Sequence, residues 1–156
     1  MKTAIIMRGL PGNGKSTIAG MLAESAGRDF DTKTLESAIC SADLYHTAPD
    51  GTYHWKPENV GKAHEFCRET FKNAVDDGVE LVIVDNTNTK NSEFEFYSNY
   101  GKANGYWVVE VTVGDASTKS VENSKKYNTH NVPEATIEGM ARRFQFGHVS
   151  REHDKK

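Results

Sequence analysis

The chain has 156 residues and a formal net charge of −3. This length is typical of one domain with a sizeable core and leaves no room for a second catalytic module, and the slightly acidic balance argues against tight, non-specific binding of nucleic acid. No apolar stretch reaches membrane-spanning length, and the two cysteines, Cys40 and Cys67, lack metal-ligand spacing. We therefore expect a single domain over residues 1–156 that lies in the cytoplasm and has no disulfides.

A glycine-rich turn follows the first predicted strand, residues 4–7. It has the sequence GLPGNGKST, residues 9–17, and fits the G-x-x-x-x-G-K-[ST] pattern, in which backbone N–H groups close around phosphate oxygens. The helix pattern that follows from Ser16 directs the positive end of its dipole at the same anion. The candidate nucleotide-binding residues are Gly9, Gly12, Asn13, Gly14, Lys15, Ser16 and Thr17.

Two residues of this loop have specific expected roles. Lys15 is expected to reach the β- and γ-phosphates, and the Ser16 hydroxyl is expected to bind Mg²⁺, so we expect ATP and Mg²⁺ as cofactors. The alternative is a glycine-rich turn without chemical function. In a chain of this length, a chance match to the pattern has a probability on the order of one in a hundred.

A short second strand, residues 37–41, follows the loop-like segment 28–36 and ends close to Asp43. In open α/β sheets, ligands lie beyond the carboxyl ends of the strands. Asp43 is therefore the candidate catalytic base, which would orient an acceptor hydroxyl and accept its proton. The alternative is an aspartate that only caps a turn or a helix.

An ordered, partly exposed loop is predicted for residues 44–57, LYHTAPDGTYHWKP. Pro57 begins a long amphipathic helix that ends at Gly78. Aromatic and imidazole side chains of this region either contact a substrate or pack the loop onto the helix. They are Tyr53, Trp55 and His64.

The third predicted strand, residues 79–85, is an apolar run that ends in an acid, as in a central strand covered on both faces. Asp85 is expected to orient the Mg²⁺ shell opposite Ser16. The next residue is Asn86, where many P-loop motor ATPases carry a glutamate that activates water, so transfer is favoured over hydrolysis. Asn86 and Asn88 are expected to hold the strand end by hydrogen bonds and are also candidates for substrate contact.

The next helix is expected to begin at the cap Asn91 and run to about residue 104, and residues 106–113 form the fourth predicted strand. Ser117 begins another helix.

A basic, helix-poor segment, residues 125–133, lies before the last predicted helix, which runs through residues 140–146. Such a segment suits a lid that closes over a triphosphate and excludes water. Residues 147–156 are expected to form a frayed tail.

The charge of the chain is uneven. Residues 1–116 hold 11 Lys and Arg against 17 Asp and Glu, whereas residues 117–156 hold 8 against 5. The basic part either faces a polyanion or is a solvated surface. Within this part, Lys126 and Arg143 are candidates for contact with the nucleotide, and Lys125 is a candidate for contact with the substrate.

Several motifs together resemble those of the kinase domain of polynucleotide 5′-hydroxyl kinases and of related small, AAA-like P-loop kinase domains. The resemblance covers nearly the whole chain through GLPGNGKST, ICSADLYH, DGTYHWKP with KAH, VIVDNTNT and KKYNTHNVP. The first motif is generic to P-loop proteins, whereas DNTN and N-x-H-N-V-P are specific to this group. The resemblance implies that Lys15 and Ser16 hold nucleotide and metal, that Asp43 is the general base, and that Asp85 supports the metal.

The chain departs from that family pattern around the acceptor. Leu44 stands where a second acid is common, His46 stands where the polynucleotide kinases have an Arg on the acceptor phosphate, and Tyr127 replaces an expected lid Arg. Lys and Arg are not equivalent on phosphates, since only the guanidinium binds two oxygens at once. The basic groups left near the lid are Lys125, Lys126 and His130.

The sequence thus predicts an α/β domain with the P-loop kinase fold, a parallel sheet of about four strands in the order 2-3-1-4, helices on both faces and a C-terminal lid. The favoured function is ATP- and Mg²⁺-dependent transfer of the γ-phosphate to a hydroxyl, above all the 5′-OH of DNA or RNA. The alternatives are a kinase of a small metabolite, nucleoside or modified base, and a nucleotide-binding module with negligible turnover. Candidate acceptor contacts are His46, Tyr53, Asn86, Asn88 and Lys125.

Overall fold

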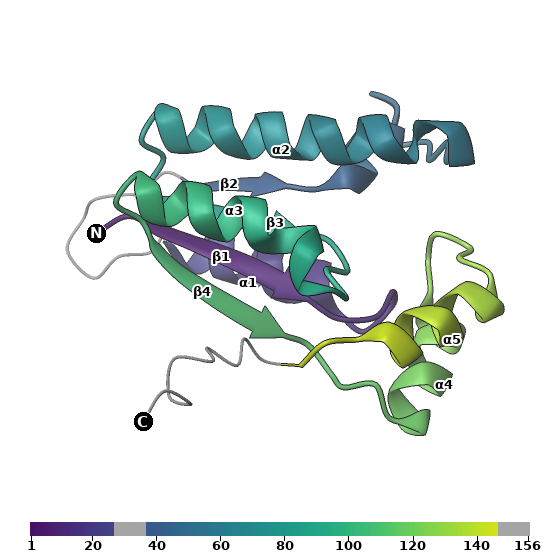
Figure 1. Ribbon diagram of the computed structural model, residues 1–156. Helices are drawn as coiled ribbons and strands as arrows, with labels where there is room; N and C mark the ends of the chain where they lie inside the picture. Colours follow the sequence, from purple (N-terminus) through teal and green to yellow (C-terminus); the bar gives the residue numbers. More distant parts are fainter. Residues whose placement is uncertain (27–36, 147–156) are drawn as a thin grey trace, which may run out of the picture.

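A computed structural model describes residues 1–26 and 37–146, so the loop expected at 28–36 and the tail expected at 147–156 lie outside the described residues. The described chain forms a parallel sheet with helices on both faces (Figure 1). The strands are β1 (Thr3–Arg8), β2 (Ser37–Cys40), β3 (Leu81–Asp85) and β4 (Trp107–Thr112). The α-helices are α1 (Lys15–Ala26), α2 (Val60–Asp76), α3 (Asn91–Ala103), α4 (Thr118–Tyr127) and α5 (Glu134–Arg143). Two short 3-10 helices are η1 (Ala42–His46) and η2 (Pro57–Asn59).

The sheet has the strand order β2-β3-β1-β4, and every pair of neighbouring strands is parallel. Ile5 of β1 is level with Ile83 of β3 on one side and with Val109 of β4 on the other. The apolar character of β1 and β3 follows from this central position, because side chains on both faces of a central strand are covered by helices. The predicted fold class and strand order are confirmed.

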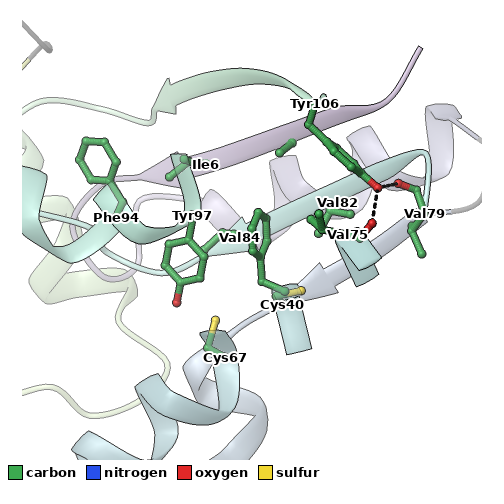
Figure 2. Close-up of a cluster of buried hydrophobic side chains, with 12 residues drawn as sticks. Ile6, Cys40, Cys67, Val75, Val79, Val82, Val84, Phe94, Tyr97 and Tyr106 are labelled. Carbon is green, nitrogen blue, oxygen red and sulfur yellow. Dashed lines mark hydrogen bonds between the residues drawn. The ribbon is translucent and has the colours of Figure 1, made fainter. Parts of the chain in front are cut away.

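Two apolar layers hold the helices on the sheet. On one face, α2 and α3 contribute Cys67, Phe71 and Tyr97 to a cluster that includes Val84 of β3 (Figure 2). Each large side chain buried in this way contributes about 1.5–3 kcal/mol of hydrophobic free energy. On the other face, α1 packs Ala19 against a second cluster on the sheet.

A buried tyrosine closes one end of the first cluster. The hydroxyl of Tyr106 donates a hydrogen bond to the carbonyl oxygen of Val79 at 2.7 Å, and it also contacts that of Val75 (Figure 2). These bonds satisfy the phenol inside the core, where an unpaired hydroxyl would be costly.

Parallel strands bring three functional segments to one edge of the sheet. The glycine-rich loop follows β1, Asp43 lies in η1 directly after β2, and Asp85 is the last residue of β3. Because all strands run in the same direction, their carboxyl ends meet at this edge, which is where α/β sheets bind ligands.

The C-terminal part differs from the sequence prediction in its boundaries. Helix α4 continues to Tyr127, so Lys125 and Lys126 are helical and the non-helical lid is limited to residues 128–133. The last helix, α5, ends at Arg143 instead of residue 146. Asn91 is the first residue of α3 instead of its cap.

Across the described residues, no helix combines the length and the apolar character that crossing a membrane requires.

Candidate active site

The turn between β1 and α1 depends on its glycines. Gly9, Gly12 and Gly14 have φ angles of 148°, 73° and 89°, which side chains with a Cβ rarely adopt. A Cβ atom on Gly9 would lie 2.5 Å from the carbonyl oxygen of Val113, and one on Gly12 would lie 2.7 Å from the backbone nitrogen of Asn128. The loop is thus held closely against the segments that follow β4 and α4.

Lys15 lies folded into this loop. Its side chain is 7% exposed, and its Nζ donates a hydrogen bond to the carbonyl oxygen of Leu10 at 2.9 Å. Burial lowers the pKa of Lys15, whereas the carboxylates of Asp85 and Asp43 favour its charged form. The ammonium has further protons to donate, so it can hold phosphate oxygens at the amino end of α1.

Ser16 and Asp85 form a pair beside the lysine. The Ser16 hydroxyl donates a hydrogen bond to Oδ2 of Asp85 at 2.6 Å, and Asp85 is 8% exposed. A hydroxyl and a carboxylate oxygen are hard ligands of the kind that Mg²⁺ prefers. The described residues contain no cluster of three or more His, Cys, Asp or Glu that could hold a metal ion. The Ser16 hydroxyl and the Asp85 carboxylate fit Mg²⁺, which uses one or two protein groups and takes its other ligands from phosphates and water.

Asp43 lies in η1, whose N-cap Ser41 accepts a hydrogen bond from the Asp43 backbone nitrogen. The carboxylate of Asp43 is 52% exposed. Its Oδ1 accepts a hydrogen bond from the Tyr53 hydroxyl at 3.0 Å, and its Oδ2 is 3.6 Å from Nε2 of His130. The carboxylate is therefore accessible from the site and held by one residue of the loop after η1 and one of the lid.

A single cavity of about 670 Å³ contains these groups. The predicted site residues that line it are Gly12, Gly14, Lys15, Ser16, Thr17, Asp43, His46, Tyr53, Asp85 and Asn86. The predicted site residues outside it are Gly9, Asn13, Asn88, Lys125, Lys126 and Arg143. The structure thus brings the phosphate loop, the candidate metal ligands and Asp43 together. It leaves Lys125, Lys126 and Arg143 outside the cavity, whereas His130 of the lid lines it.

The basic residues outside the cavity have other partners. Lys125 pairs with Glu138 at 2.6 Å and with Glu134 at 3.4 Å. The Nζ of Lys126 is 5.0 Å from the centre of the Tyr127 ring. Arg143 donates a hydrogen bond from Nε to the Thr89 hydroxyl at 3.2 Å. The two ion pairs of Lys125 join α4 to α5.

The two asparagines after β3 differ in their surroundings. Asn86 lines the cavity; its Oδ1 accepts a hydrogen bond from the Ala42 backbone nitrogen at 2.9 Å, and its Nδ2 contacts Sγ of Cys67 at 3.3 Å. Asn88 is buried with a φ angle of 44°, and its Nδ2 donates a hydrogen bond to the Met7 carbonyl oxygen at 2.9 Å. Asn88 fixes the backbone beside the loop instead of facing the cavity.

Arg8, which the sequence reasoning missed, fixes the end of β1. Its side chain is 1% exposed, and Nε donates a hydrogen bond to the carbonyl oxygen of Asn88 at 3.0 Å. The guanidinium lies 4.4 Å from the centre of the Phe94 ring and 3.8 Å from the Glu110 carboxylate. Burial lowers the pKa of Arg8, and Glu110 opposes this effect. The only available signal was a charged residue at the end of an apolar strand.

Several residues that line the acceptor side of the cavity were also not predicted. From the lid these are Thr129 and Pro133. His130, which the sequence indicated only as a basic group near the lid, also lines the cavity. Here the sequence signal was the N-x-H-N-V-P motif, which indicated a lid but not which of its side chains faces the site.

The fold, the glycine-rich loop and the Ser16–Asp85 pair define a small domain with the P-loop kinase fold. The model of the family described as AAA domain matches residues 5–146, which is most of the chain, so the chain belongs to this family.

A human relative and two solved structures illustrate the range of similar proteins. NEDD4-binding protein 2 of Homo sapiens is 27% identical over 141 residues, which are 90% of this chain and 8% of that protein. A chain of the Pnkp1/Rnl/Hen1 complex has a TM-score of 0.58 at 17% identity, covering 99% of this chain and 44% of that chain. A gluconokinase from Sinorhizobium meliloti 1021 has a TM-score of 0.56 at 18% identity, covering 94% and 78% of the two chains.

These structural likenesses, at identities under one fifth, show the fold alone. The chain spans less than a tenth of the length of the human relative.

Proposed function

We propose that this domain transfers the γ-phosphate of ATP to a hydroxyl group held at Asp43. The observation that carries this proposal is the shared cavity, in which the phosphate loop, the Ser16–Asp85 pair and Asp43 converge from three strand ends. A cavity with only the loop and the metal ligands would serve nucleotide binding equally well. The accessible carboxylate opposite the loop gives it a place for an acceptor.

Each group has a defined part in the proposed step. Lys15 and the backbone N–H groups of the loop bind phosphate oxygens and stabilise the negative charge that develops on them. Ser16 and Asp85 would hold Mg²⁺, which when bound neutralises further phosphate charge. Asp43 accepts the proton of the acceptor hydroxyl while the oxygen forms a bond to the γ-phosphorus, and ADP leaves with the electrons of the broken bond.

The surroundings of Asn86 support transfer over hydrolysis. A side-chain amide is no base at neutral pH, and this one already bonds Ala42 and Cys67. Two carboxylates of the described residues line this cavity, Asp43 and Asp85. Asp85 lies on the metal side, so Asp43 is the carboxylate positioned to accept a proton from a nucleophile.

We propose the 5′-OH of DNA or RNA as the first candidate acceptor. Its support is the motif resemblance together with the fold likeness to a chain of the Pnkp1/Rnl/Hen1 RNA repair complex. The second candidate is a small hydroxyl compound. It is favoured by the position of Lys125, Lys126 and Arg143 outside the cavity, because a nucleic acid would need cations near the acceptor end.

The experiment is transfer of labelled γ-phosphate from ATP, with Mg²⁺, into a panel of 5′-OH oligonucleotides, nucleosides and small alcohols. A nucleic-acid acceptor predicts that Lys126→Ala or Arg143→Ala raises KM more at low salt than at high salt, because screening weakens the lost contact at high salt. The salt dependence should flatten by about one unit of slope for each phosphate contact that is lost. Lys119→Ala, an exposed change on the same helix as Lys126, is the control. Saturable ATP binding in a thermal-shift assay, without transfer to any acceptor, would leave only a nucleotide-binding module.

A further inference from the structure

The wall of the cavity beyond Asp43 consists of aromatic and imidazole rings. The His130 ring, from the lid, packs on the Tyr53 ring with centroids 4.2 Å apart. His46 meets Tyr53 edge-on, with ring centroids 5.8 Å apart. Trp55 also lines the cavity and is 51% exposed. Rings of this kind bind the flat faces of aromatic ligands by stacking. Such stacking depends little on the identity or the charge of the ligand.

The charges around this wall disfavour an anionic acceptor. Among the described residues that line the cavity, Lys15 is the only lysine or arginine, and it belongs to the phosphate loop. The carboxylate of Asp43 is the nearest full charge on the acceptor side, and a phosphate group next to it would meet a like charge. Burial is the main effect on His64 and lowers its pKa, which favours its neutral form. An uncharged acceptor avoids this repulsion.

His46 adds a polar group to the same wall. Its side chain is 6% exposed, and Nδ1 is buried without a hydrogen-bond partner in the part of the chain that the structure describes. A buried imidazole nitrogen without a partner is unfavourable, and reorientation of the ring can present either nitrogen to a ligand. The polar edge of a heterocyclic ring is a suitable partner for it.

We propose that the acceptor is an uncharged compound of the nucleoside type, whose planar base is recognised by Trp55 and the Tyr53–His130 pair. Its hydroxyl would lie at Asp43, and a phosphate adjoining the hydroxyl would add nothing to its binding. This inference rests on the proposed phosphotransfer, whose acceptor it specifies. It decides between the two candidate acceptors by placing the recognition on the ring instead of on the phosphates.

Binding can be tested without turnover, because the chain has only two tryptophans, Trp55 and Trp107. Trp107 lies on β4, is 68% exposed and does not line the cavity. In Trp107→Phe, the tryptophan fluorescence therefore comes from Trp55 alone. With the ATP site filled by a non-hydrolysable ATP analogue and Mg²⁺, thymidine, uridine and adenosine should quench it saturably, and their 3′-monophosphates should bind no more tightly. Trp55→Phe, which leaves only Trp107, is the matched control and should show no quenching.

The kinetic arm uses the same acceptors. Stacking on one aromatic side chain changes binding affinity by about 5- to 150-fold. Trp55→Ala should therefore raise KM for a nucleoside by about 5- to 150-fold and change kcat little. Trp55→Phe should restore most of the affinity, and Trp107→Phe should match the unmodified protein. KM for a nucleoside should not depend on salt, because an uncharged acceptor makes no phosphate contact.

The inference is overturned if a nucleoside 3′-phosphate or a 5′-OH oligonucleotide binds more than about tenfold tighter than the nucleoside. It is equally overturned if ribose or glycerol serves as well as a nucleoside. Transfer to acceptors without any Trp55 signal would refute the ring site and leave the phosphotransfer intact. Saturable quenching of Trp55 without transfer to any acceptor would refute the phosphotransfer and leave the ring site intact.

Discussion

Replacing Gly12 by alanine tests whether the phosphate loop and the lid are held together. Gly12 has a φ angle of 73°, and a Cβ atom there would lie 2.7 Å from the backbone nitrogen of Asn128 and 2.8 Å from the carbonyl carbon of Tyr127. Cβ atoms essentially never approach other atoms closer than 3.0 Å, and both neighbours are backbone atoms that cannot rotate away. Gly12→Ala must therefore displace the loop or the start of the lid.

Gly14 provides the matched comparison within the same loop. Its φ angle is 89°, and a Cβ atom there would have no heavy atom within 4 Å. Gly14→Ala thus carries only the backbone strain of a left-handed residue, about 1–2 kcal/mol. Gly12→Ala carries a similar strain plus about 1–3 kcal/mol for overpacking. For a domain of this size, 1 kcal/mol corresponds to about 2–4 °C in Tm, so Gly12→Ala should melt about 2–12 °C below Gly14→Ala.

The assay is thermal and urea unfolding of the ligand-free variants, followed by circular dichroism. Ligand-free protein is required because both glycines belong to the candidate nucleotide site. Gly51→Ala, at a φ angle of 85° with no heavy atom within 4 Å of the added Cβ, measures the same strain in the loop after η1. Equal Tm values for Gly12→Ala and Gly14→Ala would refute the reasoning, because they would mean that the lid yields to the loop without cost.

Four further predictions concern the site and its surroundings. Lys15→Ala should nearly abolish phosphoryl transfer while circular dichroism shows an unchanged fold; unchanged turnover in this variant would remove the kinase proposal. Asp43→Asn should lower kcat by about 10²–10⁴-fold with little change in ATP affinity, and near-normal kcat would make Asp43 structural only. Chelation of Mg²⁺ by EDTA should stop transfer, and Ser16→Ala should raise the Mg²⁺ concentration needed to restore it; an equal requirement in both proteins argues against Ser16 as a ligand. Hydrogen bonds from Ser117 and then Ser120 lower the pKa of Asp115 from 3.8 to about 2, so its carboxylate stabilises the fold above pH 3.8 and loses this effect as the pH falls through about 2. Asp115→Asn should therefore flatten the acid part of the stability curve measured by urea unfolding, and an unaltered slope there would contradict this assignment.

Features that depend on residues close together in the sequence could be predicted from the sequence alone. The glycine spacing of residues 9–17 requires a tight turn, and the apolar runs before Arg8 and Asp85 define central strands by their length and composition. The strand order followed from the same pattern, because parallel strands joined by helices allow few topologies. The shared edge that holds Lys15, Asp43 and Asp85 follows from the parallel direction of these strands.

The partners of the charged side chains were decided by the tertiary structure. Lys125 was expected to contact the substrate, but α4 and α5 pack so that Glu138 and Glu134 take its ammonium group. His130 meets Asp43 although 87 residues separate them in the sequence, and Arg8 donates to the carbonyl oxygen of Gln145, 137 residues away. A local pattern gives the position and type of an element, whereas the partner of a long polar side chain depends on which distant element packs beside it. Such pairing is a balance of desolvation and charge that exists only in the folded chain.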